Sequence, residues 1–521
     1  MSSPTILTQS LLAAFGLAVL CAPTPAQSAK LEWSGGQLGA TVQYDLTGPL
    51  GQVYGLVPSL GAGPTPLAFF DPLDPRSLEV GLDLFSYAKF GALLPTASVS
   101  FPLPLIPGLS SLQLHAQFVT LDLAGGTPTL VDQLSNPSVF VLGQSGDMLA
   151  PRSTVLTARQ GHTATLLNDG RVLIVGGDEP DTAGVLTTTS DFELYDPQTQ
   201  TFVAGGPLTQ PRSTHTATLL NDGRVLIVGG YPVNGPSIAS ATAELFDPVS
   251  GLCTPAAAPA MGRTLHTATR LADGRVLIVG GGAKFDLNDI FGSLATVVAT
   301  SELYDPATNS WGAGPSLGTP RMAHQATLLG DGRVLVSSGV KIANLFGLPI
   351  PAITTSCRRY DPPTNSFLPS AAIPQGRAYH GQIGLPSGGA MVVGGATGDF
   401  VALTFTTHTD AFTYNHMSDS WTTAGQLSVG RAYPNLVDLG GSIAVLSGLK
   451  TVDITTGSGT PATEVEVAGY SGISWSVAGN QKLAREVARA VPVDGGQRIL
   501  IVGVGDNGIP AVDLTAEVFL P

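Results

Sequence analysis

Five of the eight histidines in this 521-residue chain occur in one short motif, each three residues after an arginine. Imidazoles gathered in a ring could bind a metal ion or an anion. Alternatively, the arginine and histidine of each motif could brace their own unit by hydrogen bonds to neighbouring turns, and a motif present in nearly every unit favours bracing over a binding site. The five are His162, His215, His266, His324 and His380.

The motif opens a sequence unit that recurs seven times. The clearest copy, RSTHTATLLNDGRVLIVGG, runs from Arg212 to Gly230 and is followed by AELFDP, Ala243 to Pro248. A fixed period indicates one supersecondary unit whose apolar face is buried only by its neighbours. The seven copies, called repeats one to seven below, start 51 to 58 residues apart at Arg159, Arg212, Arg263, Arg321, Arg377, Arg431 and Arg485.

Each repeat predicts four strands. HTATLL is a short β-rich run, and Asn221-Asp222-Gly223 supplies the residues of a tight hairpin. VLIVGG is a continuous apolar run typical of a strand covered on both faces. AELFDP predicts a third strand, and an aromatic or apolar residue after the next turn, such as Trp311, indicates a fourth. Four antiparallel strands per unit form a propeller blade.

The spacing of these residues resembles that of kelch repeats. The resemblance rests on the Gly-Gly pair, on Tyr195 and Tyr304 about eighteen residues later, and on the following Trp311 and Trp421, and it covers residues 147–521. It implies an all-β fold, a seven-bladed kelch β-propeller whose first strands line a central channel. The five histidines would then form a ring at the channel mouth. Some copies depart from the pattern: Ser338 and Ser447 replace the first glycine, Gly503-Val504 keeps one glycine, and Pro434 replaces the histidine.

Repeat seven stops after its third strand, at Ala516 to Pro521. An extra strand precedes repeat one, at residues 147–152, and Leu149 lies ten residues before Arg159 just as Phe202 precedes Arg212. We expect this segment to complete the last blade, which would close the ring and protect its edges.

The segments before the propeller indicate export and a second domain. Residues 1–28 read as a secretory signal peptide with an apolar core at Leu11 to Cys21, too short to span a bilayer. Residues 30–145 lack the repeat and carry alternating runs separated by Pro-Gly turns, which predicts a small β-sandwich-like domain. We therefore expect a secreted, extracellular or periplasmic protein. Removal of the signal peptide would leave two cysteines, Cys253 and Cys357. They fall in non-adjacent blades and are not expected to form a disulfide.

The amino-acid composition limits the classes of partner that the protein is expected to bind. Only 12% of the residues are charged, and the net charge is −14 without long acidic blocks. Nucleic acids and anionic membrane surfaces require clustered Lys and Arg, so neither is an expected partner, and no further segment is expected to insert into a membrane. The sequence leaves the oligomeric state open.

Long, variable loops between the second and third strands would lie together on one face, where binding usually resides. They carry aromatic and acidic residues that we expect to bind a protein or carbohydrate ligand, although the same residues could instead pack the loops. The candidates are Tyr231, Phe285, Asp289, Phe291, Phe346 and Phe400, with Asp286 and Asp399 beside them.

The favoured function is therefore binding or scaffolding without catalysis, with no catalytic residues, metal or cofactor expected. The alternative is a carbohydrate-active enzyme, or a copper-radical oxidase of the galactose oxidase type, which resembles a kelch propeller in fold. Such an oxidase needs a Tyr cross-linked to a Cys, a second Tyr and two His at copper, and neither Cys253 nor Cys357 is expected at the channel mouth. In a third possibility the propeller is a spacer and the N-terminal domain carries the activity.

Overall fold

The computed structural model of the chain describes residues 29–521 apart from short stretches, the longest being 68–75, 106–109, 122–130, 181–185, 233–237, 400–403, 453–458 and 507–514. The expected signal peptide lies outside the described residues. The chain divides into two compact units, Met1–Ser145 with Gln198–Gln200, and Gly146–Pro197 with Thr201–Pro521. None of the described helices is long and apolar enough to cross a membrane.

The first unit contains two sheets that share a core. The alternation in TVQYDLT buries Val42, Tyr44 and Leu46 on one face of a strand. These side chains pack with Leu56 and Phe118 of the other sheet in one cluster. The three-stranded sheet has the order β1 (Lys30–Ser34), β2 (Thr41–Thr47), β7 (Thr96–Pro102). The five-stranded sheet has the order β10 (Ser138–Val141), β8 (Gln113–Leu121), β3 (Val53–Ser59), β6 (Lys89–Ala92), with β9 (Val131–Leu134) also paired to β8. A separate hairpin joins β4 (Ala62–Pro66) and β5 (Ser77–Val80).

The second unit is built from four-stranded antiparallel sheets, seven of them within the described residues. Repeats one to three form β12 (Thr163–Leu166), β13 (Val172–Val175), β16 (Asp191–Asp196), β17 (Thr201–Pro207); β18 (Thr216–Leu219), β19 (Val225–Val228), β20 (Ala243–Asp247), β21 (Leu252–Pro255); and β22 (Thr267–Arg270), β23 (Val276–Val279), β24 (Ser301–Asp305), β25 (Ser310–Ala313). Repeats four to six form β27 (Gln325–Leu328), β28 (Val334–Ser337), β31 (Cys357–Asp361), β32 (Ser366–Ser370); β33 (Gly381–Gly384), β34 (Ala390–Val393), β37 (Asp410–Asn415), β38 (Ser420–Gln426); and β39 (Asn435–Asp438), β40 (Ser442–Leu446), β41 (Glu464–Gly469), β42 (Ser476–Asn480).

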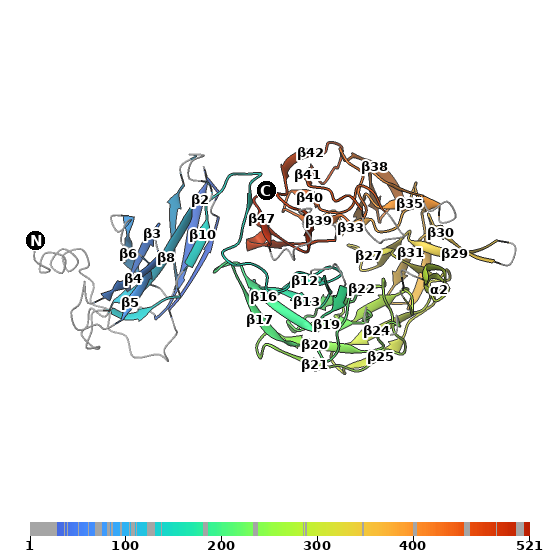
Figure 1. The fold of residues 1–521 in the computed structure, drawn as a ribbon, viewed down its shortest axis with the longest axis horizontal. Coiled ribbons are helices and arrows are strands. Elements are labelled where there is room, and N and C mark those ends of the chain that lie inside the picture. Colours follow the sequence, from blue (N-terminus) through green and yellow to red (C-terminus); the bar gives the residue numbers. More distant parts are fainter. Residues whose placement is uncertain are drawn as a thin grey trace, which may run out of the picture. The chain divides into compact units, whose positions relative to one another are not determined.

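The remaining sheet joins the two ends of the unit. Repeat seven supplies β44 (Arg489–Val493), β45 (Arg498–Val502) and β47 (Glu517–Phe519). The fourth strand is β11 (Met148–Leu149), in which Met148 lies opposite Phe519. The first strands β12, β18, β22, β27, β33, β39 and β44 contact one another in that order, and β44 contacts β12, so the sheets form a ring (Figure 1). The expected all-β class is confirmed, and the arrangement is that of a β-propeller.

Apolar second strands fill the space between neighbouring sheets. VLIV of β13, β19 and β23 is fully buried, with alternate residues on opposite faces of each sheet. Leu173 and Val175 of repeat one pack with Val225 and Ile227 of repeat two in one cluster. Each core therefore belongs to two repeats, which explains why one repeat alone would not fold.

The Gly-Gly pair has two different backbone requirements. Its first position has φ near 60°, and serine accepts this conformation in two repeats, at Ser338 and Ser447 with φ 56°. Its second position has φ 81° at Gly230 and 101° at Gly339, and an added Cβ at Gly230 would lie 2.6 Å from the Ser213 carbonyl oxygen. Only glycine fits such a backbone without strain.

Replacing Gly230 by alanine should therefore lower the free energy of unfolding by about 2–4 kcal/mol, from backbone strain together with the contact to Ser213. The matched control is Gly206→Ala, since a Cβ at Gly206 meets nothing within 4 Å and its φ is not positive. That substitution should leave stability unchanged within about 1 kcal/mol. Urea denaturation followed by tryptophan fluorescence measures both, and equal midpoints would contradict the argument.

The loops after the Gly-Gly pair are more regular than the irregular loops expected. Hairpins form from β14 (Asp178–Pro180) and β15 (Leu186–Thr188), β29 (Val340–Leu345) and β30 (Leu348–Ile353), and β35 (Ala396–Asp399) and β36 (Thr404–Thr407). β26 (Arg321–Met322) adds to β29, and β43 (Ala484–Arg485) pairs with β46 (Gly505–Asp506). The loop of repeat three contains the one-turn helix α2 (Ile290–Leu294). Elsewhere, the 3-10 turn η5 (Asp494–Gly496) connects β44 to β45 in repeat seven.

Candidate functional site

The arginine of each repeat is buried and bridges strands. In repeat two, Arg212 Nη1 donates to the Gly229 carbonyl at 2.8 Å, and Nη2 donates to Glu244 Oε1 at 2.7 Å. The other Glu244 oxygen accepts from the Thr209 amide, so the pair ties the chain entering the repeat to its third strand. The pairs among the described residues are Arg159–Glu193, Arg212–Glu244, Arg263–Glu302, Arg377–Asp410, Arg431–Glu466 and Arg485–Glu517.

Repeat four lacks this carboxylate, because Arg358 occupies the position of Glu302 in the repeat pattern. Arg321 instead donates to the Ser338 and Ser356 carbonyls and to the Ser356 hydroxyl, at 2.7–3.0 Å. Burial lowers the pKa of Arg321 to about 10. Both Nη groups are therefore bonded by neutral oxygens, while Nε is buried without a hydrogen-bond partner among the described residues.

Four of the five histidines contact the preceding repeat rather than their own, whereas the ring of His162 has no hydrogen-bond partner among the described residues. The Nε2 atoms of His215, His266 and His324 lie 2.9–3.0 Å from the hydroxyls of Thr163, Thr216 and Thr267 in the preceding repeat. His380 contacts Ser337 in the same way, at 2.9 Å. Burial lowers the pKa of His266 and His324 to about 3. The pKa values of His162, His215 and His380 are also lowered, first by burial and then by neighbouring arginines.

The residue just before the histidine, or before Pro434 in repeat six, has a positive φ in repeats one to six. Ordinary residues avoid positive φ, and such strain concentrates at functional sites. The amides and carbonyls of these residues bond from repeat to repeat, as in Tyr433 N to Tyr379 O at 2.7 Å and Thr214 N to Gly161 O at 2.8 Å. The positions with their φ values are Gly161 66°, Thr214 54°, Leu265 52°, Ala323 52°, Tyr379 53° and Tyr433 55°.

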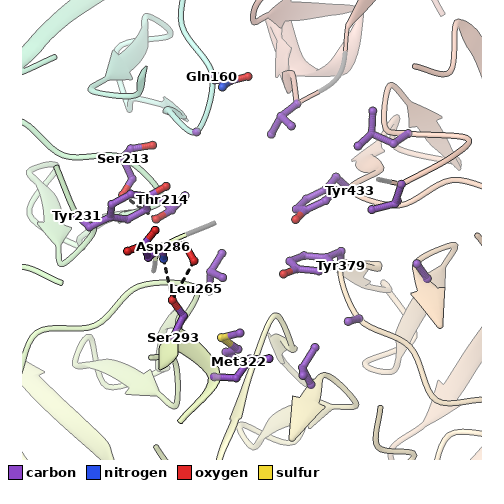
Figure 2. Close-up of a pocket in the computed structure, with 18 of the residues that line it drawn as sticks. Gln160, Ser213, Thr214, Tyr231, Leu265, Asp286, Ser293, Met322, Tyr379 and Tyr433 are labelled. Carbon is purple, nitrogen blue, oxygen red and sulfur yellow. Dashed lines mark hydrogen bonds between the residues drawn. The ribbon is translucent and has the colours of Figure 1, made fainter. Parts of the chain in front are cut away.

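Five of these positions line a cavity of about 220 Å³, together with residues of the loops after the Gly-Gly pairs (Figure 2). The cavity is smaller than the roughly 300–1,000 Å³ of sites that take drug-sized ligands. It has room for one small ring. Besides five of these positions, its lining includes Gln160, Asp178, Ser213, Tyr231, Asp286 and Met322.

Two tyrosines form one wall. The rings of Tyr379 and Tyr433 stack with centroids 4.3 Å apart and an interplanar angle of 29°. Both hydroxyls point into the cavity toward the side that carries Tyr231 and Thr214 (Figure 2). Burial raises the pKa of Tyr231, Tyr379 and Tyr433. The phenols are therefore neutral at physiological pH and can both donate and accept hydrogen bonds.

The opposite wall is polar and acidic. Asp178 accepts from the Thr188 hydroxyl at 2.8 Å and the Ser213 hydroxyl at 2.6 Å, while burial raises its pKa. Asp286 lies beside Tyr231, and its amide donates to Ser293 Oγ at 2.8 Å (Figure 2). The side of repeats three to five is apolar, with Leu265, Leu294, Met322, Val340 and Ile353 among its lining residues.

The structure brings two of the predicted loop residues, Tyr231 and Asp286, into this cavity. Asp289 is exposed and pairs with Lys284 at 2.6 Å, away from the lining. Phe285, Phe346 and Phe400 lie outside the described residues, as does the side chain of Phe291. Tyr379 and Tyr433 were missed by sequence reasoning. Both residues between the arginine and the histidine vary from repeat to repeat, so their variation did not single out this position.

A copper-radical centre does not fit these residues. Within the described lining, the cavity has tyrosines but neither histidine nor cysteine. Cys357 is buried with Leu335 and Phe412 between repeats four and five, and Cys253 packs against the core between repeats one and two. Burial raises the pKa of the Cys357 thiol to about 11. In the described part of the chain, no three His, Cys, Asp or Glu side chains are grouped to hold a metal ion.

Comparison with known proteins gives the fold alone. The chain matches neither a protein-family model nor a curated protein. Among solved structures, YjhT matches with a TM-score of 0.46 and 16% identity over 62% of this chain and 98% of its own. A fungal alcohol oxidase of the AA5 family, solved in complex with copper, matches with a TM-score of 0.54 and 16% identity over 73% of this chain and 76% of its own. The chain therefore shares the β-propeller fold of that oxidase.

Proposed function

We propose that this chain is a secreted, seven-bladed kelch-type propeller, preceded by a β-sandwich-like domain, that binds a carbohydrate. Each four-stranded sheet would be one blade, with β11 as the last strand of the seventh. The extracellular or periplasmic location rests on the signal-like residues 1–28. The proposed partner is a sugar, with no nucleic acid and no membrane insertion, and binding uses the long-loop face.

The cavity at the channel mouth carries this proposal. A sugar ring presents several hydroxyls that donate and accept, together with apolar C–H faces. The cavity offers neutral phenols from Tyr231, Tyr379 and Tyr433, carboxylates from Asp178 and Asp286, and an apolar side. A largely apolar cavity with a few fixed polar groups is typical of small-molecule sites. The stacked pair Tyr379–Tyr433 holds two hydroxyls in place, which reduces the entropy lost on binding.

Replacing Tyr433 by phenylalanine should weaken sugar binding about 5- to 10-fold, because one hydrogen bond in a buried site is lost. Isothermal titration calorimetry of the mature chain against a panel of neutral monosaccharides measures the effect. The control is Tyr470→Phe, since the Tyr470 hydroxyl donates to Asp438 Oδ1 at 2.5 Å, near the opposite end of the sheet. Equal losses in both variants, or no binding of any sugar by the native chain, would contradict the proposal.

A carbohydrate-active enzyme is the second candidate. The observation that favours it is a pair of carboxylates, Asp178 and Asp286, on one cavity with the pKa of Asp178 raised by burial. Glycoside hydrolysis uses one protonated and one ionised carboxyl group. Aryl glycosides of each sugar that binds distinguish the two functions, because a binding protein releases no phenol whereas an enzyme releases it and Asp178→Asn abolishes the release.

A further inference from the structure

Repeat seven places a cation where the other repeats place uncharged residues. The first residue of the innermost strand is Thr163, Thr216, Thr267, Gln325, Gly381 and Asn435 in repeats one to six, and Arg489 in repeat seven. Arg489 opens β44 and follows the cavity residue Val487 by two positions. It therefore stands one step along the channel from the cavity.

The substitution also changes the contact with repeat one. In repeats one to three the residue at this position is a threonine that bonds the next repeat's histidine, for example Thr163 with His215. Arg489 instead donates from Nε to the His162 carbonyl at 3.0 Å. Both ring nitrogens of His162 lack a hydrogen-bond partner among the described residues. Arg489 is thus directed along the channel wall rather than toward the neighbouring imidazole.

Arg489 differs from the buried arginines of the repeats because it has no ion pair with any described residue. Six of those arginines are paired with a carboxylate. A guanidinium has five N–H donors, and for Arg489 only Nε is bonded to a described protein acceptor. The positive charge is close enough to the cavity wall to oppose the rise in the pKa of Tyr433, and it lowers the pKa of His162 and His215. Positive charge without an ion pair among the described residues therefore lies two residues along the chain from the lining residue Val487, next to the lining rather than within it.

The charged residues that line the cavity itself are acidic, and they lie at a different level of the channel from Arg489. Asp178 and Asp286 come from the loops after the Gly-Gly pairs of repeats one and three, and Asp178 pairs with Gln160 before the innermost strand of repeat one begins. A ligand with hydroxyls at one end and a carboxylate at the other would be oriented by this separation. Its hydroxyls would face the two aspartates, and its carboxylate would face the guanidinium, which matches carboxylate geometry in a bidentate manner.

We propose that Arg489 binds the carboxylate of a sugar acid whose ring fills the cavity formed by Tyr231, Tyr379 and Tyr433. This inference rests on the proposed function and narrows it from sugars in general to acidic sugars. Arg489 would be the residue that selects the acidic form over the neutral one. The remaining cavity residues would bind both forms equally.

Calorimetry with matched pairs tests the selection: glucuronate against glucose, galacturonate against galactose, and mannuronate against mannose. The native mature chain should bind at least one acid 10-fold or more tightly than its neutral partner. Arg489→Gln should abolish that preference while the neutral sugar binds within about twofold of the native value. The matched control is Arg270→Gln, because Arg270 ends the inner strand β22 at the far end of the channel and donates Nη1 to the Leu219 carbonyl of the preceding repeat at 2.8 Å.

The outcomes separate the two proposals. If acid and neutral sugar bind equally to the native chain, or if the preference survives in Arg489→Gln, the role of Arg489 is wrong and sugar binding stands. If no sugar of either kind binds, both proposals fail. Inorganic phosphate and acetate serve as simple anions, and displacement of the sugar acid by either one at equal concentration would show an anion site without sugar selectivity. Thermal denaturation confirms that Arg489→Gln is folded, so a lost preference is read only from a folded variant.

Discussion

Lowering the pH from 7.5 to 5.5 should remove most of the stability of the propeller, because five buried histidines must stay neutral for it to remain folded. The pKa values of His266 and His324 are lowered to about 3, and those of His162, His215 and His380 lie well below the ordinary value. In the unfolded chain each histidine titrates near 6.5. Below that pH the unfolded state therefore binds protons that the native state cannot bind, and stability falls as the pH falls.

The size of the effect follows from linkage. Each histidine removes about 1.4 kcal/mol at pH 5.5, one unit below its unfolded pKa, so five remove about 7 kcal/mol. That amount is comparable with the whole stability of a typical domain, about 5–15 kcal/mol. Urea midpoints measured between pH 7.5 and 5.5 should fall steeply, and the loss should begin near pH 6.5 rather than near the pKa of carboxylates.

The control for this prediction comes from the repeat pattern, since repeat seven has Ala488 at the histidine position. His266→Ala should be less stable at pH 7.5, because it loses the contact with Thr216. Its stability should nevertheless depend less on pH, by about one fifth of the native slope. A native protein whose urea midpoint is constant from pH 7.5 to 5.5 would show that these imidazoles are not held neutral.

The strands of each repeat could be predicted from the sequence because the signals that specify them are local. Alternation, the Asp-Gly turns and the VLIV runs each act within a few residues, so the four strands of a repeat were predictable. The partner of each histidine was not, since the hydroxyl of Thr163 that meets His215 belongs to a different repeat. The sequence suggested bracing inside each repeat, whereas four of the five imidazoles join one repeat to the next.

The cavity was harder to predict for a different reason. The predicted ligand residues were loop residues such as Tyr231, whereas Tyr379 and Tyr433 are part of the motif itself. Their side chains point into the cavity because both residues have a positive φ, and a tyrosine in the sequence does not indicate that conformation. The one local clue was Gly161, which occupies the same position in repeat one and takes φ 66° without strain.

Replacing Glu244 by alanine should lower the free energy of unfolding by about 3–5 kcal/mol, because it leaves a buried arginine without its countercharge. Arg212 and Glu244 are 0% and 1% exposed and lie 2.7 Å apart. The variant also removes the acceptor of the Thr209 amide. The matched control is Asp222→Ala, which breaks the exposed pair Asp222–Arg224 and should cost at most about 1 kcal/mol. Urea denaturation at pH 7.5 measures both.

Repeat four indicates how much of the stability lost in Glu244→Ala comes from the missing carboxylate partner of the arginine. Arg321 has no carboxylate and is nevertheless bound by the Ser338 and Ser356 carbonyls and the Ser356 hydroxyl. An arginine at this position can therefore be accommodated when a hydroxyl replaces the carboxylate. Arg212 already has the Thr242 hydroxyl at 3.0 Å and the Gly229 carbonyl at 2.8 Å. If these two acceptors satisfied Arg212 fully, Glu244→Ala would cost no more than Asp222→Ala. We expect a clear difference, because in repeat two the same carboxylate also holds the entering chain through Thr209, and alanine replaces neither contact.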